Sequence, residues 1–152
     1  MATKTTFKLG EILTLSEEIH GLQDRQSGAK VQNGLLDEKI SLVQKYWLND
    51  LGKKTKEISD ELEPLRNDLI KKYGDEGPDG SIGVSAFHDI KNEEGVVVGK
   101  QPNPKWTEFQ NEYGALLDQE REIEHHEFLL GDFSEVKSEN RYAIFMDKVI
   151  KP

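Results

Sequence analysis

Apolar side chains recur every three or four residues along much of the chain, and this spacing places them on one face of an α-helix. The first such segment covers about residues 9–22, where Gly21 and the polar stretch after it end the pattern. Its apolar positions are Leu9, Ile12, Leu13, Leu15, Ile19 and Leu22. We therefore predict a short N-terminal helix.

The longest apolar stripe has steps that average about 3.7 residues, close to the period of a straight helix. It consists of Leu36, Ile40, Val43, Trp47, Leu51, Thr55, Ile58, Leu62, Leu65, Leu69 and Tyr73. Gly52 costs a helix about 1 kcal/mol relative to alanine, and Pro64 lacks the amide donor and clashes with the carbonyl of Asp60. We predict one long helix with a kink near residues 60–64, and the alternative is a break into two helices there.

Turn-forming residues end this pattern in the stretch DEGPDGSIG, directly after Gly74. Beyond it, SIGVSAFHDI and VVVGKQ flank the turn KNEEG, with alternating residues in the first arm and β-branched residues in the second. This arrangement predicts a β-hairpin over residues 81–100. Since a lone hairpin is only marginally stable, we expect it to contact a helix or to pair with another chain.

Asn103 and Pro104 form a strong helix start, an N-cap followed by a proline at the first helical position. We predict a second long helix from there to about Leu130 and Gly131, with an apolar stripe of Trp106, Phe109, Tyr113, Leu116, Leu117 and Ile123. A short terminal helix is predicted from the helical spacing of Tyr142, Phe145, Met146 and Val149.

Together these elements predict a mainly α protein with minor β structure, formed by residues 1–152 as a single elongated helical domain. Two long helices fold back as an antiparallel helical hairpin with the β-hairpin inserted at the turn. The short N-terminal helix and the C-terminal helical segment pack against them. The order of long helix, β-hairpin and long helix is similar in layout to prefoldin-type chaperone subunits.

Composition favours association through apolar surfaces. Hydrophobic residues are 35% of the 152 residues and charged residues 32%, so the apolar stripes are narrow and two helices leave part of them uncovered. The formal net charge of -9 opposes binding to nucleic acids and to anionic membranes, which require clustered lysine and arginine. We therefore expect a protein partner, self-association into a homo-oligomer, or both.

The absence of cysteine excludes disulfides, thiolate metal sites and cysteine nucleophiles. No apolar run approaches the ~20 residues of a membrane span, and the N-terminal stretch MATKTTFKLGEIL contains no apolar signal region. We expect a cytoplasmic protein or a component of a particle assembled in the cytosol.

The stretch REIEHHEFLL raises the question of a metal site. Glu122 and His125 have the spacing at which one helix offers a carboxylate and an imidazole, and Glu17 and His20 repeat it, as in carboxylate-bridged di-metal bundles. Further carboxylates for such a bundle would come from Glu38, Glu57 or Glu61. A glutamate-rich chain produces this spacing by chance, and on a helix His125 would point about 200° away from Ile123 and the apolar stripe. We expect no metal and no cofactor, with a metal-binding bundle as an alternative.

No pattern in the sequence favours catalysis. His88 has Ser85 and Asp89 close by, but residues of one short strand alternate between faces and do not converge as a catalytic triad does. The glycines of GDEGPDGSIG match neither a phosphate-binding loop nor a dinucleotide fingerprint. We predict a protein that is not an enzyme.

Two acidic stretches suggest a further alternative. EISDELE at residues 57–63 and DQEREIEHHE at residues 118–127 could present carboxylates as a DNA mimic does, in an inhibitor of a host defence or nucleic-acid-binding protein. The same residues are also typical of solvated helix faces, with their charge relieved by nearby Lys53, Lys54, Lys56 and Arg121. The two interpretations differ in salt dependence, which is steep for an acidic inhibitor.

The residues that we expect at an interaction surface belong to two groups. Trp47, Trp106 and Phe109 lie on the predicted apolar stripes, which two helices alone do not cover. Val96 and Val98 lie in the second arm of the predicted hairpin. We hypothesise that binding buries the uncovered stripes and adds strand pairing over residues 82–98.

The stretches GLLDEKISLVQKYWLNDLGKKTKEISDELEPLRNDLIKKYG and NPKWTEFQNEYGALLDQEREIEHHEF, separated by a Gly/Asp turn, resemble small acidic helical proteins of unknown function encoded by tailed bacteriophages. The resemblance covers about residues 9–133 and rests on general texture. It implies an accessory factor, either a virion or assembly component or a protein that blocks a host defence, and it assigns no catalytic residue.

Overall fold

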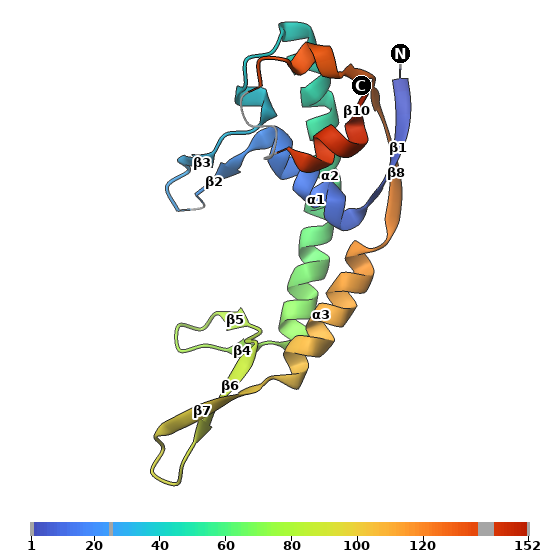
Figure 1. The fold of residues 1–152 in the computed structure, drawn as a ribbon. Coiled ribbons are helices and arrows are strands. Elements are labelled where there is room, and N and C mark those ends of the chain that lie inside the picture. Colours follow the sequence, from blue (N-terminus) through green and yellow to red (C-terminus); the bar gives the residue numbers. More distant parts are fainter. Residues whose placement is uncertain (1, 25, 137–141, 152) are drawn as a thin grey trace. The chain divides into compact units, whose positions relative to one another are not determined.

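A computed structural model describes residues 2–24, 26–136 and 142–151 (Figure 1). Of these residues 50% are helical and 26% lie in strands, and the strands form five sheets of two strands each. The prediction of a mainly α helical hairpin with minor β structure is therefore wrong. The chain divides into two compact units, unit 1 with residues 1–60 and 118–152 and unit 2 with residues 61–117.

Unit 1 contains a long two-stranded ribbon. Strand β1 (Ala2–Lys8) pairs antiparallel with β8 (Glu120–His126), so that Thr3 lies opposite His125 and Phe7 opposite Arg121. Alternate side chains of the ribbon face the interior, because successive residues of a strand point to opposite faces.

The second predicted long helix is wrong beyond Leu117, where α3 (Pro104–Leu117) ends. The stretch REIEHHEFLL belongs mainly to strand β8 and not to the end of a helix. Ile123 and His125 are both buried, and their spacing of two residues fits a strand and not one face of a helix.

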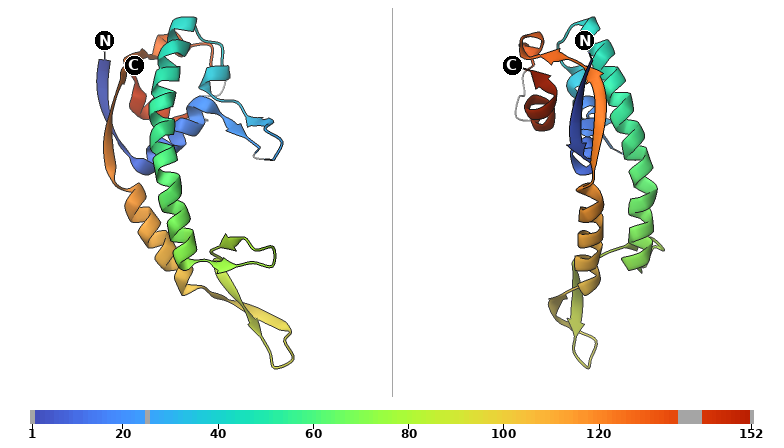
Figure 2. Two further views of the ribbon diagram at one scale, coloured as in Figure 1. Left: turned by 180° about the vertical axis from the view of Figure 1, so that it is seen from behind. Right: turned by 90° about the vertical axis from the view of Figure 1, so that its right-hand side faces the viewer.

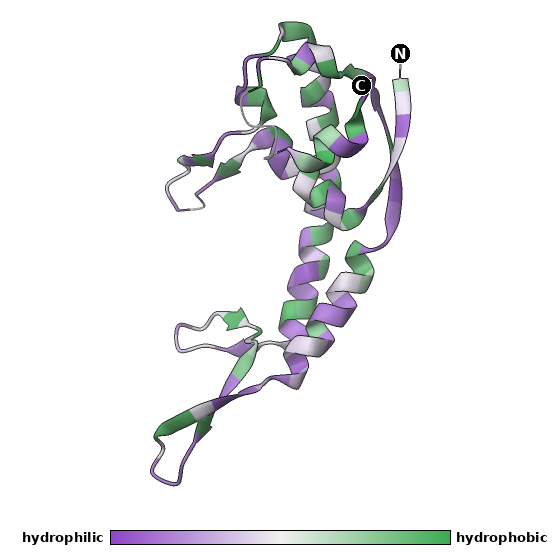
Figure 3. Ribbon diagram, viewed as in Figure 1, coloured by the Kyte–Doolittle hydropathy of each residue, from purple (hydrophilic) through white to green (hydrophobic). Residues whose placement is uncertain are grey.

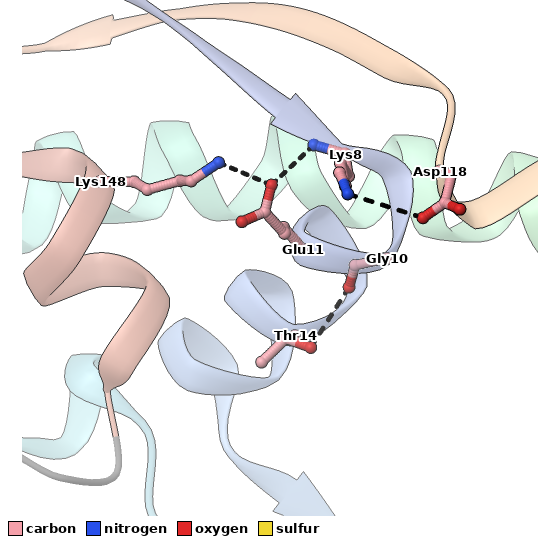
Figure 4. A network of polar contacts seen from close by, with 6 residues as sticks. All are labelled: Lys8, Gly10, Glu11, Thr14, Asp118 and Lys148. Atoms are coloured by element: carbon pink, nitrogen blue, oxygen red, sulfur yellow. Dashed lines mark hydrogen bonds and ion pairs between the residues drawn. The ribbon is translucent and has the colours of Figure 1, made fainter. Parts of the chain in front are cut away.

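Helix α1 (Leu9–His20) follows β1 directly and buries Ile12, Leu15 and Ile19, as its apolar spacing predicts. The Glu11 carboxylate accepts hydrogen bonds from the Lys8 backbone N–H at 2.9 Å and from Lys148 Nζ at 2.7 Å (Figure 4). The first of these bonds caps the N-terminal end of the helix. The second joins α1 to the C-terminal segment of the same unit.

A small ribbon and a short helix lie between α1 and the next long helix. Strands β2 (Leu22–Gln23) and β3 (Lys30–Gln32) pair antiparallel, and the 3-10 helix η1 (Leu35–Asp37) buries Leu35 in the core.

Helix α2 (Leu42–Tyr73) is the longest element and contributes to both units. It begins after Leu36 and Ile40, which lie outside it, and Pro64 stands inside one continuous helix, so the alternative of two separate helices is wrong. Its buried residues include Leu48, Leu51, Thr55, Ile58 and Leu62.

The C-terminal part of unit 1 completes the core with aromatic side chains. Strand β9 (Phe128–Leu129) pairs in parallel with β10 (Ile150–Lys151), and between them lie the 3-10 helix η2 (Leu130–Phe133) and the π-helix η4 (Phe145–Val149). The predicted terminal helix is thus present as a π-helical turn. The rings of Phe128, Phe133 and Phe145 have centroids 5.1 to 5.9 Å apart.

Unit 2 contains the end of α2, the two hairpins β4 (Asp75–Glu76) with β5 (Ile82–Gly83) and β6 (Phe87–Lys91) with β7 (Val97–Pro102), and helix α3. Residues 82–83 of the predicted hairpin arm thus pair with β4 and not with β7.

Within unit 2, α3 lies beside the end of α2 (Figure 2). The Tyr73 hydroxyl donates to Glu112 Oε2 at 2.6 Å, and Lys72 Nζ lies 3.3 Å from the same oxygen. The helices are nevertheless unequal, with 32 residues in α2 and 14 in α3.

Candidate interaction surface on the β6–β7 hairpin

The hairpin of β6 and β7 is an antiparallel pair with one register shift, beside Ile90, and a defined turn. Asp89 lies opposite Lys100 and Ile90 opposite Gly99. At the turn, Asn92 Oδ1 accepts the backbone N–H groups of Glu94 and Val96, both at 3.0 Å. These bonds hold the turn that joins the two strands.

The base of the hairpin is fixed by Asn103, whose side chain is buried. Its backbone N–H donates to Ala86 O at 2.9 Å and its Nδ2 donates to Ser85 O at 2.7 Å. Its Oδ1 accepts the N–H of Lys105 at 3.0 Å, which is the N-cap predicted for α3. One residue thus joins the hairpin to the start of the helix.

All five side chains of β6 are exposed, although the hairpin is rich in apolar residues (Figure 3). The exposed apolar residues are Phe87, Ile90, Val96, Val97 and Val98. We call these five residues, together with the main-chain groups of β6, the hairpin surface. Several exposed apolar side chains on one small hairpin favour an interaction site.

The two edges of the hairpin differ in their capacity to accept another strand. Asn103 N–H donates a hydrogen bond to Ala86 O, so Ala86 and Asn103 form a hydrogen-bonded pair. Hydrogen-bonded and non-hydrogen-bonded pairs alternate along an antiparallel ladder. The main-chain groups of Phe87 and Asp89 therefore point outward from β6. On the β7 side the outward position at Pro102 has no N–H, and the register shifts beside Ile90, so this edge is irregular.

Of the five residues predicted for interaction, Val96 and Val98 lie on the hairpin surface, where they are 54% and 63% exposed. Phe109 is buried in unit 2. Trp106 is half-buried, and its ring stacks on that of Phe109 with the ring centroids 5.8 Å apart. Trp47 belongs to unit 1, where it is half-buried and stacked on His126 at 4.7 Å. The three aromatic rings are buried or half-buried and stack on neighbouring rings, whereas Val96 and Val98 are exposed.

The two histidine motifs considered for metal binding lie on different elements, strand β8 and helix α1. Glu122 and His125 are three residues apart in a strand and so point to opposite faces. His20 Nε2 lies 3.0 Å from Gly52 O and donates to it. In the described part of the chain, no group of three or more His, Cys, Asp or Glu side chains could hold a metal ion.

The imidazole of His125 is instead a buried structural group. Its Nδ1 lies 2.8 Å from His126 O and its Nε2 lies 2.8 Å from Thr5 Oγ1. Because a carbonyl only accepts, Nδ1 carries the proton of the neutral ring and Nε2 accepts from the Thr5 hydroxyl. Burial lowers the pKa of His125, mainly by desolvating the charged form.

The second acidic stretch forms one face of the ribbon. Glu120, Glu122 and Glu124 are exposed on β8 and face outward together. The opposite positions on β1 include Lys8 and Lys4, and Lys4 Nζ lies 3.8 Å from Glu122. The carboxylates are therefore interleaved with cations, which weakens their likeness to a phosphate backbone.

A cavity of about 440 Å³ lies between α1 and α2 within unit 1. Its lining is polar and of mixed charge, with Glu17, His20, Lys56, Ser59 and Asp60 among the lining residues. The His20 ring is hydrogen-bonded to Gly52 O and is therefore not available as a base for a neighbouring nucleophile. The hairpin is for this reason the stronger candidate site.

One residue of the sequence, Pro102, indicates which edge of the hairpin is open. Pro102 lies in the second arm, and a proline in a two-stranded pair marks the edge that cannot accept a further strand. The opposite strand, with Asp89, Ile90 and Lys91, is then the open edge. The register that reveals this depends on pairing that only the structure supplies.

No family model, curated protein or solved structure matches this chain. None of the helices in the described ranges combines the length and the apolar character required to cross a membrane.

Proposed function

We propose that this chain is a non-enzymatic binding protein that contacts another protein chain through the hairpin surface. The observation that carries the proposal is that all five residues of β6 are exposed in a sheet of two strands. The outward main-chain groups of β6 are free to pair with a strand supplied by a partner, as in binding by strand addition.

Energetics supports this role. An isolated two-stranded hairpin is marginally stable in water, and an added strand supplies both hydrogen bonds and a neighbour for its side chains. Burial of apolar area contributes roughly 25 cal/mol per Å², and Phe87 and Val98 are 58% and 63% exposed. The hairpin therefore gains stability when a partner covers it.

The broader role that we propose is that of an accessory factor in assembly, as the resemblance to phage proteins implies, acting in the cytoplasm and without a cofactor. The interaction is mainly apolar and main-chain in character, so its affinity should depend weakly on salt. An acidic inhibitor that captures a basic partner should lose affinity steeply as salt rises.

Site-specific photo-cross-linking tests the proposal. A photoreactive phenylalanine analogue at Phe87 reports on the hairpin surface, and the same analogue at Tyr46 provides a matched control, since the two side chains are 58% and 67% exposed. In cells that produce the protein, position 87 should yield a cross-linked species of one defined mass, and position 46 should not.

Equal or absent cross-linking at the two positions contradicts the proposal. Repeating the irradiation in cell lysate at low and high salt separates the two kinds of partner. Cross-linking at position 87 that persists at high salt supports an apolar interface. Cross-linking that disappears favours an acidic inhibitor.

A further inference from the structure

We infer that the β6 edge pairs antiparallel with the β6 edge of a second copy of this chain, about a two-fold axis at Ile90. The inference rests on the proposed function and names the partner. Two hairpins joined in this way form one sheet of four strands, in the order β7, β6, β6 and β7. A sheet of four strands exceeds the minimum of about three strands that an independently stable sheet needs in water.

The edge geometry selects β6 and not β7. Outward main-chain groups occur at alternate residues of β6, at Phe87, Asp89 and Lys91. The strand contains no proline or glycine, and the register shift beside Ile90 leaves its extra residue on β7. The β6 edge is therefore the regular one.

Charge complementarity selects the register. Pairing about Ile90 places Asp89 of each copy opposite Lys91 of the other, as a hydrogen-bonded pair on one face of the sheet. By symmetry the favourable pair occurs twice, and opposite charges at such positions stabilise a sheet. The sequence of β6 is thus complementary to itself when it runs antiparallel.

The neighbouring registers lack this complementarity. A shift that centres the axis on Asp89 sets the two Asp89 carboxylates directly opposite each other, which is destabilising. A shift that centres it on His88 sets Asp89 opposite Phe87 of the second copy. Registers displaced by one residue set inward-facing main-chain groups against outward ones and cannot form the ladder.

The position opposite Ile90 in its own hairpin carries no side chain. The residue opposite it is Gly99, which has no side chain, and a Cβ placed there would lie 3.8 Å from Ile90 Cδ1. Ile90 is 39% exposed. In the proposed pairing the two Ile90 residues form the central non-hydrogen-bonded pair, in which side chains approach most closely, so each isoleucine receives the apolar neighbour that Gly99 does not provide.

Complementary charge reversal tests this register. Asp89→Lys gives a chain with lysine at both positions, and Lys91→Glu gives a chain with carboxylates at both. Each variant alone sets like charges opposite each other, and the dimer dissociation constant should rise about tenfold or more. In an equimolar mixture every opposed pair is again attractive, so a heterodimer should form with near wild-type affinity.

The measurement is absolute mass by light scattering and sedimentation at micromolar to millimolar chain concentrations. The wild type and the mixture should approach twice the chain mass of 17.3 kDa, while each variant alone should remain closer to one chain mass. Asp68→Lys and Lys71→Glu make the same charge changes on exposed positions of α2, and these variants should dimerise like the wild type, alone or mixed. Circular dichroism verifies that each variant is folded, which matters because Asp89→Lys also sets two lysines opposite each other within the hairpin.

Three outcomes overturn the inference: a monomeric wild type at all concentrations, single variants that dimerise like the wild type, and a mixture that fails to restore the dimer. The proposed function is judged separately. A monomeric wild type that still cross-links from position 87 to a different protein removes the second copy as partner and leaves the hairpin surface as a binding site. A monomer that also fails to cross-link removes both.

Discussion

Thr5 Oγ1 lies 2.8 Å from Nε2 of His125, although the two residues are 120 positions apart in the chain. In the ribbon register Thr5 is opposite Ile123 and Thr3 is opposite His125, so the bond runs diagonally on the inner face. The imidazole is almost completely buried. The Thr5 hydroxyl therefore supplies the hydrogen bond that the buried Nε2 of His125 cannot obtain from water.

Replacing Thr5 with valine should destabilise the protein by about 1–3 kcal/mol, because Nε2 of His125 is then buried without a partner. Urea unfolding followed by circular dichroism measures the change. Thr6→Val is the matched control, since Thr6 is exposed on the outer face of the same strand, and it should cost less than about 0.5 kcal/mol. Equal effects of the two substitutions would show that the bond does not stabilise the ribbon.

Stability should fall as pH decreases below about 6.5. Burial holds the pKa of His125 below its ordinary value of 6.5, so the unfolded chain binds a proton more readily than the folded one in this range. The contribution of His125 is therefore complete above 6.5 and is lost as pH falls toward the lowered pKa. Unfolding midpoints of His125→Gln between pH 7 and 5.5 should show a weaker pH dependence than the wild type, while exposed His88→Gln should retain it.

Glu18 should anchor the C-terminal segment. Its buried carboxylate accepts the N–H groups of Phe145 at 2.9 Å and Ile144 at 3.2 Å, the first donors of the terminal helical turn. Glu18→Ala leaves these donors without their partner and should cost about 2 kcal/mol. Exposed Glu17→Ala is the control and should have little effect on unfolding.

Hydrogen exchange at the amides of Ile144 and Phe145 shows whether this effect is local. Faster exchange in Glu18→Ala but not in Glu17→Ala is expected, and unchanged exchange would contradict the anchoring role. Burial also raises the pKa of Glu18, so its contribution to stability is greatest below its ordinary value of 4.5 and declines as pH rises through the raised pKa. Glu18→Gln should remove that dependence while retaining one acceptor.

Gly52→Ala should destabilise the protein, although alanine is the better helix former. A Cβ at this position would lie 2.9 Å from Cε1 and Nε2 of the His20 ring and 3.0 Å from Cγ2 of Ile19. The clash should cost about 1–3 kcal/mol. Gly114→Ala in α3 meets no atom within 4 Å and should stabilise by about 0.5–1 kcal/mol. Thermal unfolding compares the two, and stabilisation by both would show that His20 can move aside.

The sequence was informative where a local signal agreed with the tertiary structure. Helix α1 buries the apolar residues that its spacing predicts, and Asn103 caps α3 as the Asn-Pro pair indicates. The sequence alone did not decide whether Pro64 divides the long helix. Proline destabilises a helix interior by about 3 kcal/mol, and the helical residues on either side of Pro64 offset this cost.

The ribbon of β1 and β8 was missed for a physical reason. Its first strand, ATKTTFK, has one large apolar residue, Phe7, and its second strand presents Ile123 and His125 to the interior. A buried histidine is polar in any hydropathy pattern, so the alternation was hidden. Pairing between positions about 120 residues apart leaves no local signal in a single sequence.

Part of the proposed interaction surface was predicted from the sequence. Val96 and Val98 were predicted from β-branched content alone, and both are exposed in the structure. The role of Asp89, Ile90 and Lys91 as an open edge depends on register, which the sequence of the turn does not specify because the ladder contains a bulge.

The division of the chain has a consequence for the order of folding. Unit 2 is one continuous segment, residues 61–117, whereas unit 1 is assembled from the segments on both sides of it. Strand β1 cannot pair with β8 until residues 120–126 have left the ribosome, so β1 remains unpaired while residues 9–119 are synthesised. Long-range closure of this kind slows folding, so unit 2 should acquire structure first and completion of the β1–β8 ribbon should set the overall rate.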